Sequence, residues 1–286
     1  MATPAGLAAF HHPQVNHAIR EMLNAYGAFL NTTESTHVLV RDPHGWFGNE
    51  GYSALTELAV PPPNTPRFED IYVANESLPH FGYKTWDDFF TREWRDGLRP
   101  VADPLDDNVL TNACESSPVA LVHDAKLHQD FWIKGQPHSL AEILGGPENA
   151  KKFENGTLYQ AYLSALSYHR WHAPVSGTVK KVLHINGTYY AENPYMGFPG
   201  GGQQPDPAGP DLSQPYIAAV ATRAVVFIEA DNEAIGEMAL VFVGMSEVST
   251  AEVTVGEGDK VEKGDQLGMV CLFFFVHVLC QCLSLS

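Results

Sequence analysis

Two histidines three residues apart are the first residues whose types and spacing suggest chemistry. His169 and His172 lie in the stretch 168–179, which we expect to end an apolar helical run and to open a strand at Gly177. In a last helical turn the two rings would share a face, whereas in an extended segment they would point to opposite sides. Histidine titrates nearest neutrality, so either geometry favours proton transfer. The alternative for such a pair, when no other motif supports catalysis, is two hydrogen-bonded histidines of the surface or the core that have no catalytic role.

Other common catalytic chemistries lack a motif in this chain. A zinc site would need further ligands at suitable spacing, and no CxxC or HExxH pattern occurs, so we expect no metal. A serine nucleophile elbow is also disfavoured, because the stretch 244–248 lacks the second glycine and lies in a strand pattern. No GxGxxG follows a strand and no Walker loop is present, so the sequence gives no motif for a nucleotide cofactor.

The composition limits the classes of binding partner and the cellular compartment that we expect for this protein. The 286 residues can bury one large core or two smaller ones, and the 34 acidic against 17 basic residues give a net charge of -17. This charge disfavours nucleic acid and anionic membrane surfaces as partners. Four cysteines form no disulfide framework and the first ten residues lack a signal-peptide pattern, so we expect a cytoplasmic protein. The apolar stretch 272–285 is short for a bilayer, which disfavours membrane contact.

The first hundred residues are expected to be helical. Apolar residues recur at helical spacing from Val15 to Leu30, and Gly51 to Val60 can form a second helix before a run of three prolines. Thr85 should cap a short helix whose first turn carries acidic residues, where they complement the helix dipole. This helix should end before Gly97.

Beyond residue 100 the pattern changes to short strands. Several of the later ones are nearly all apolar and should be buried on both faces. Residues 139–144 and 159–166 are expected to form helical turns, and 193–211 a long irregular loop. The expected strands are 109–113, 119–123, 131–134, 177–185, 187–191, 217–228 and 235–244.

The stretch 253–268 alternates strand residues with Gly-Asp turns, a pattern that makes tight β-corners. Together with 173–179 it resembles the sandwich of biotinyl and lipoyl carrier domains, although no modifiable lysine occupies a hairpin tip, which disfavours a carrier function. The expected fold class is therefore α+β, a helical N-terminal region followed by a β-rich catalytic domain with a biotinyl/lipoyl-like sandwich element.

In combination, these motifs resemble the pyruvoyl-dependent phosphatidylserine decarboxylases, and within them the fungal tryptophan-decarboxylase branch. The resemblance runs from the first residues to Met269 and joins many separate stretches, which makes it specific. The matching stretches are 83–92, 99–101, 112–116, 132–140, the histidine segment, 187–192, 209–214, 227–232 and 244–250.

The resemblance implies a self-processing decarboxylase, a carboxy-lyase whose cofactor is a pyruvoyl group made from a serine of its own backbone. That carbonyl forms a Schiff base with the substrate amine and accepts the electrons of the breaking carboxylate bond. The implied substrate is a small molecule, either a tryptophan-like amino acid or the serine head group of phosphatidylserine, as in phospholipid biosynthesis. His172 matches the base that assists the serine, and His169 the histidine near the reacting substrate. Glu115 stands where the family carries an aspartate and could orient His172.

The largest departure from the family lies at the end of the chain. After Met269 the family continues with a Phe-Gly-Gly-Ser-Thr-like strand, whereas this chain reads VCLFFFVHV over 270–278, with no serine after a glycine. The sequence therefore predicts a C-terminally incomplete, catalytically silent member in which no residue forms the pyruvoyl group. A non-catalytic binding or assembly protein of the same family is the alternative.

The predicted domains follow from these patterns. Residues 1–100 form a helical phosphatidylserine-decarboxylase-associated domain, 101–269 a catalytic domain lacking its last strand, and 270–286 an apolar tail foreign to the family. The sequence is compatible with a homo-oligomer and leaves the oligomeric state open.

Overall fold

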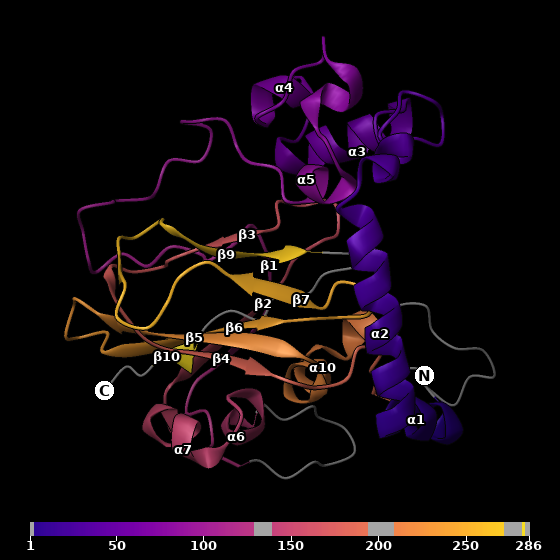
Figure 1. Ribbon diagram of the computed structural model, residues 1–286. Coiled ribbons are helices and arrows are strands. Elements are labelled where there is room, and N and C mark those ends of the chain that lie inside the picture. The colour runs from indigo at the N-terminus through magenta and orange to yellow at the C-terminus, as the bar shows by residue number, and fades with distance from the viewer. Residues whose placement is uncertain (1–2, 129–138, 194–208, 272–281, 284–286) are drawn as a thin grey trace.

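A computed structural model describes residues 3–128, 139–193, 209–271 and 282–283. The helices within residues 49–90 gather at one end of the molecule, above two antiparallel sheets, whereas the helices within residues 4–30 run down one side of the sheets toward the opposite end. A small group of short helices covers the far side of the larger sheet (Figure 1). The fold class is α+β, as predicted. The carrier-like sandwich element stays a prediction.

The N-terminal region begins with a short helix and a long one that passes beside the sheets, and it continues into short helices around an aromatic core (Figure 1). Its elements are α1 (Pro4–Phe10), α2 (Pro13–Leu30), the 3-10 helix η1 (Thr33–Val38), α3 (Asn49–Ala59), α4 (Phe68–Ile71), the 3-10 helix η2 (Pro79–Gly82) and α5 (Trp86–Phe90). The three helices predicted from the sequence are confirmed as α2, α3 and α5. Thr85 caps α5, because its hydroxyl accepts a hydrogen bond from the Asp88 amide at 3.0 Å.

Every paired strand in the two sheets runs antiparallel to its neighbours. The larger sheet has the order β1-β2-β10-β6-β5-β4-β8, and the smaller one has the order β3-β9-β7. The strands are β1 (Ser117–Val122), β2 (Thr157–Tyr162), β3 (Arg170–His172), β4 (Gly177–Ile185), β5 (Arg223–Ala230), β6 (Glu237–Val243), β7 (Thr250–Val253), β8 (Lys260–Val261), β9 (Gln266–Cys271) and β10 (Cys282–Leu283).

Two hydrophobic cores lie on opposite faces of the larger sheet. On β5, Val226 and Ile228 belong to the core shared with the N-terminal region, while Val225 and Phe227 belong to the second core. This alternation confirms the prediction that the apolar strands are buried on both faces. The second core is covered by α6 (Leu140–Ile143), α7 (Pro147–Ala150), the 3-10 helix η3 (Lys151–Phe153) and α10 (Gln214–Val220), and α9 (Gly209–Leu212) precedes α10 in the chain.

The first core joins the helical region to the sheets across residue 100. Phe89 and Phe90 of α5 belong to the same buried cluster as Trp171 of β3 and Phe242 of β6. Trp171 lies flat on Phe242, with ring centroids 3.7 Å apart, and faces Gly268 across the β3–β9 pair. A Cβ on Gly268 would approach the Trp171 ring to 2.7 Å, so only glycine fits opposite this indole. The packing therefore fixes β3, which carries His172, against α5.

Four predictions about secondary structure were wrong. Residues 159–166, predicted as a helical turn, begin inside β2, where pairing to both β1 and β10 places them in the sheet. Residues 217–220 of the predicted strand 217–228 belong to α10, which has a proline in its first turn. Residues 109–113 form no strand, and 187–191 contribute only an isolated bridge between Thr188 and Ala221. The predicted strand 131–134 lies outside the described residues.

Candidate active site

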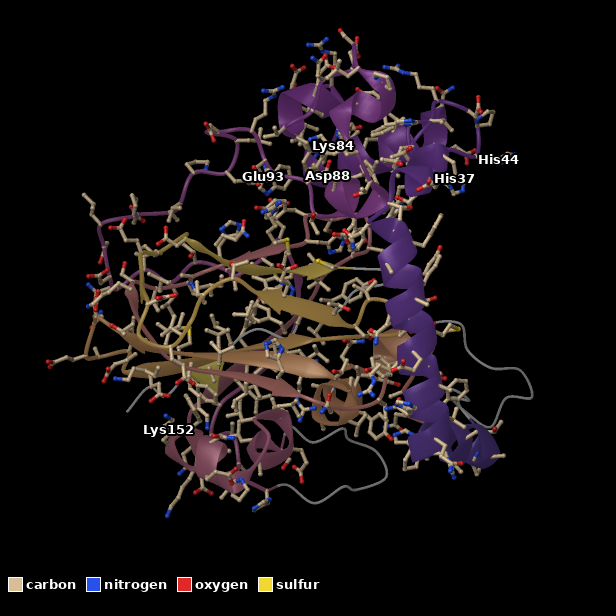
Figure 2. The ribbon with its side chains drawn as sticks, viewed as in Figure 1. His37, His44, Lys84, Asp88, Glu93 and Lys152 are labelled. Atoms are coloured by element: carbon tan, nitrogen blue, oxygen red, sulfur yellow. The ribbon has the colours of Figure 1, made fainter. Side chains whose placement is uncertain are left out.

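A cavity of about 1050 Å³ lies between the helical region and β3. Its wall is formed by residues within 93–102, 110–117 and 162–172, with Gly264 and Gln266 from the turn and strand that follow β8. Glu93 of this wall lies at the sheet-facing edge of the helical region, whereas Lys152 lies at the opposite end of the molecule beside α7 (Figure 2). The cavity therefore sits where the two halves of the fold meet.

His172 lies on the cavity wall with both ring nitrogens paired. Nδ1 is 2.8 Å from the Gly264 carbonyl oxygen, and Nε2 is 2.9 Å from the Tyr168 hydroxyl. A carbonyl can only accept, so Nδ1 carries the hydrogen and the lone pair of Nε2 accepts from Tyr168. Burial lowers the pKa of His172 below its ordinary value and Arg170 lowers it further, although the Gly264 hydrogen bond opposes both. His172 is thus a neutral base at neutral pH.

His169 lies behind the wall and not on it. Its side chain is fully buried and stacks on Phe90, with ring centroids 3.9 Å apart. Nε2 donates to the Ala165 carbonyl at 3.0 Å, while Nδ1 has no hydrogen-bond partner among the described residues. Burial lowers the pKa of His169 to about 3. The histidine segment leads into β3 and is extended, the second of the two geometries that the sequence left open, and the two rings occupy different environments.

Glu115 reaches the same cavity as His172, but the two side chains are not bonded. The Glu115 carboxylate accepts a hydrogen bond from Arg99, whose guanidinium also donates to the Ala59 carbonyl at 2.6 Å. The Arg99 guanidinium lies 4.5 Å from the centre of the Trp94 ring. In this structure Glu115 therefore has Arg99 as its partner, while His172 is held by other groups.

Three successive ring contacts link the helical region to His172, and of the four residues involved only His172 has a role predicted from the sequence. Tyr72 stacks on Trp94 at 4.7 Å, Trp94 on Tyr168 at 5.0 Å, and Tyr168 on His172 at 5.7 Å between ring centroids. We call these four residues the aromatic column. Tyr168 stands beside His169 in the sequence, which is the single signal that could have singled it out.

The turn that presents Gly264 to His172 is fixed by a buried lysine. The Lys263 ammonium donates to the carbonyls of Asp103, Asp106 and Val109 at 2.6, 2.8 and 2.9 Å. Gly264 has a φ of +96°, and a Cβ there would lie 2.4 Å from a methyl group of Val101. Glycine is therefore required at this position, and its carbonyl has a fixed direction.

A second cluster of titratable groups lies at the end of β9. The Cys271 thiol donates to the Glu252 carboxylate, with Sγ and Oε2 3.7 Å apart, and Asp87 of α5 interacts with both residues. Burial, with a contribution from the Glu252 charge, raises the pKa of Asp87 to about 6. Within the described ranges, no three His, Cys, Asp or Glu side chains are placed to hold a metal ion.

Comparison with known proteins gives consistent matches. Two family models, both described as phosphatidylserine decarboxylase, match residues 86–272 and 1–55. Decarboxylase iboD of Amanita muscaria is 42% identical over 93% of this chain and 77% of its own length. The L-tryptophan decarboxylase of Psilocybe cyanescens is 38% identical over 94% of this chain, which spans 62% of that protein. Phosphatidylserine decarboxylase proenzyme 3 of Schizosaccharomyces pombe is 30% identical over 71% of this chain and 19% of its own length.

Among the described helices, none combines the length and the apolar character needed to cross a bilayer.

Proposed function

The chain belongs to the phosphatidylserine decarboxylase family, and on this premise we propose that the cavity beside His172 is the active site of a carboxy-lyase. By family the chain is a decarboxylase. The observation that carries the proposal is the cavity wall shared by His172 and Glu115, because it places a neutral base and a carboxylate on one concave surface. The residues of the proposed site come from both halves of the fold.

The proposed substrate is an amino acid with an aromatic side chain, such as tryptophan. Two relatives that match most of this chain are named L-tryptophan decarboxylase. The faces of Trp94 and Tyr168 are covered by neighbouring groups of the aromatic column and by Arg99, but both residues line the cavity wall, where their edges suit an aromatic side chain because edge-to-face ring pairs are favourable. The serine head group of phosphatidylserine is the second candidate, and it is suggested by relatives named phosphatidylserine decarboxylase proenzyme.

In this proposal His172 accepts a proton at Nε2, the one nitrogen of its ring that carries a lone pair. Glu115 and Arg99 form a charge-balanced pair at the cavity wall, where they can bind the charged groups of an amino acid. His169 shapes the site from behind, because its buried ring supports the strand segment that leads to His172. A direct role for His169 on the substrate stays a prediction.

The family implies a pyruvoyl group, and the residues of this chain do not fit its formation. That group arises from a serine that follows a glycine, but the 286 residues contain no Gly-Ser pair. Beyond β9, the two serines at 284 and 286 each follow a leucine. We therefore propose that this polypeptide does not generate the carbonyl by itself, and we assign no decarboxylation step to it. The missing serine also favours the second candidate function, a non-catalytic binding or assembly protein.

The proposed domain organisation follows the same division. Residues 1–100 supply the helical wall of the cavity, 101–269 supply His172 and Glu115, and 270–286 form a tail of different composition. The hydrophobic core shared across residue 100 holds the first two parts together.

The experiment that tests this proposal introduces the Gly-Gly-Ser-Thr pattern that the family carries and this chain lacks. The quadruple variant Phe273→Gly, Phe274→Gly, Phe275→Ser, Val276→Thr gives the tail the pattern that the family carries after β9. We expect this variant to cleave itself before position 275, to form a phenylhydrazine adduct at the new N-terminus, and to release CO2 from carboxyl-labelled tryptophan. The wild-type chain should stay in one piece and release none.

The matched control carries Phe275→Ala in place of Phe275→Ser and should also remain intact. Mass spectrometry and CO2 trapping measure both outcomes. Release of CO2 by the wild-type chain would overturn the proposed inactivity. A quadruple variant that folds, as judged by circular dichroism, but neither cleaves nor decarboxylates would overturn the active-site assignment.

A further inference from the structure

We propose that Tyr168 is a positioning residue for His172, whose hydroxyl pairs with Nε2 and holds the imidazole in the tautomer that carries its hydrogen on Nδ1. The importance of this tautomer for catalysis rests on the proposed function, but the pairing itself does not. Two hydrogen bonds, of 2.8 Å to Gly264 and 2.9 Å to Tyr168, meet at opposite sides of one ring. Together they fix both the rotation and the tautomer of the imidazole.

The two partners of His172 have different chemical abilities. The Gly264 carbonyl can only accept, so it always requires a hydrogen on Nδ1. A phenol can both donate and accept, so Tyr168 can donate to the neutral Nε2 and accept from it after protonation. The Tyr168 hydroxyl therefore keeps Nε2 paired in both charge states, which matters because an unpaired buried polar group is costly.

The ring of Tyr168 is itself held in place. Its side chain is 5% exposed and lies between Trp94 and His172 in the aromatic column. The Trp94 ring in turn stacks on Tyr72 and lies under the Arg99 guanidinium. A phenol with so little freedom returns its hydroxyl to the same place, so the helical region contributes to the orientation of His172.

Burial also keeps the hydroxyl in its donating form. It raises the pKa of Tyr168 far above the ordinary value, so the phenol is protonated throughout the physiological range. Burial and Arg170 lower the pKa of His172, so its Nε2 is free of hydrogen at neutral pH. The donor and the acceptor thus match over the same range.

The experiment is nitrogen NMR of the full wild-type chain labelled with 15N-histidine, at pH 8. The His172 signals are assigned by their loss in a His172→Asn variant. We expect a protonated Nδ1 and an unprotonated Nε2 whose resonance has the upfield shift of a hydrogen-bond acceptor. In Tyr168→Phe the Nε2 resonance should move downfield to that of a free lone pair, while Nδ1 stays protonated because Gly264 remains.

The matched control is Tyr72→Phe, which removes a hydroxyl from the same column without touching His172. Its His172 spectrum should be unchanged. A hydrogen on Nε2 in the wild type, or an Nε2 resonance that ignores Tyr168→Phe, would overturn the proposal. If Tyr168→Phe does not fold, the wild-type chain decides alone, through the presence or absence of a nuclear Overhauser contact between the Tyr168 hydroxyl and the His172 ring.

A second readout connects the pairing to catalysis. In the quadruple variant that restores the Gly-Gly-Ser-Thr pattern, adding Tyr168→Phe should slow self-cleavage at least tenfold, while adding Tyr72→Phe should leave the rate unchanged. Equal rates would overturn the catalytic part of the inference. The NMR measurement needs no cleavage, so a failure of the proposed function and a failure of the Tyr168 pairing give different results.

Discussion

His169 and His172 stand three residues apart, yet one belongs to the core and the other to the cavity wall. The His169 ring is fully buried against Phe90 of α5, and it makes a single hydrogen bond among the described residues. The His172 ring faces the cavity and has a partner at each nitrogen. In an extended segment an odd spacing sends side chains to opposite faces. The same short motif therefore supplies one supporting residue and one candidate base.

The difference in environment gives the two rings different tendencies to take up a proton. His169 is surrounded by apolar groups and by the positive charge of Arg92, so protonation is unfavourable there. His172 is partly open to the cavity, and the Gly264 carbonyl offsets part of the cost of its burial. The spacing of the two histidines does not distinguish them, whereas their burial shows that only the His172 ring lines the cavity.

The largest expected effect is on stability when the buried ring is removed. His169→Ala should lower the free energy of unfolding by about 3 kcal/mol, because it leaves a cavity beside Phe90. The matched variant His172→Ala should cost only about 1 kcal/mol, since that ring lines the cavity, where water can take its place, and its loss mainly removes hydrogen bonds. Urea unfolding followed by circular dichroism measures both. Equal losses would show that the two rings support the fold alike.

The second effect is a pH dependence that belongs to His169. The unfolded chain takes up a proton on this residue below its ordinary pKa of about 6.5, whereas the folded chain does not until about 3. The unfolded state therefore binds more protons between these values, and stability falls as the pH is lowered through this window, with a limiting slope of about 1.4 kcal/mol per pH unit. His169→Phe should remove this slope. If the free energy of unfolding of His169→Phe, measured by urea titration, kept the pH dependence of the wild type, the assignment of this slope to His169 would be contradicted.

Asp87 provides a control of opposite sign. Its pKa in the folded chain is raised to about 6, so between about 3.9 and 6 the folded state binds more protons than the unfolded state. Its contribution to stability therefore falls as the pH rises through 6. Asp87→Asn removes this opposing contribution and should make the loss of stability in acid steeper. If the variant instead flattened the profile, the assignment of the two groups would be reversed.

The elements that could be predicted from the sequence are those with a local signal. The periodic apolar residues of α2 and the Thr85 cap of α5 are read from neighbouring positions, and β4 occupies the range 177–185 that its bounding glycine and apolar residues predict. β2 and the start of α10 were missed, because their apolar stretches carry no clear period. β2 is a strand because β1 and β10 pair with it, and those partners are distant in the sequence.

The site divides in the same way. The chemistry of His172 and its place in a cavity could be anticipated from residue type and position. Its partners could not, since Gly264 lies 92 residues away in the chain and reaches His172 only through the pairing of β3 with β9. The same holds for Glu115, whose carboxylate pairs with Arg99 and not with His172, a choice of partner that the sequence spacing does not reveal.

The smallest expected effect comes from a substitution of Glu115, and it tests whether the carboxylate on the cavity wall orients His172. Glu115→Gln should change the free energy of unfolding by less than about 1 kcal/mol, because the Arg99 ion pair is about one-third exposed on both sides and is screened by solvent. The His172 tautomer should also stay the same in 15N spectra, since neither of its nitrogens bonds Glu115. In the processing-competent quadruple variant, a strong loss of cleavage with Glu115→Gln and an unchanged tautomer would assign the carboxylate to the reacting groups. A changed tautomer would instead show that Glu115 orients His172, as the sequence resemblance implies, and would contradict the separation drawn between the two.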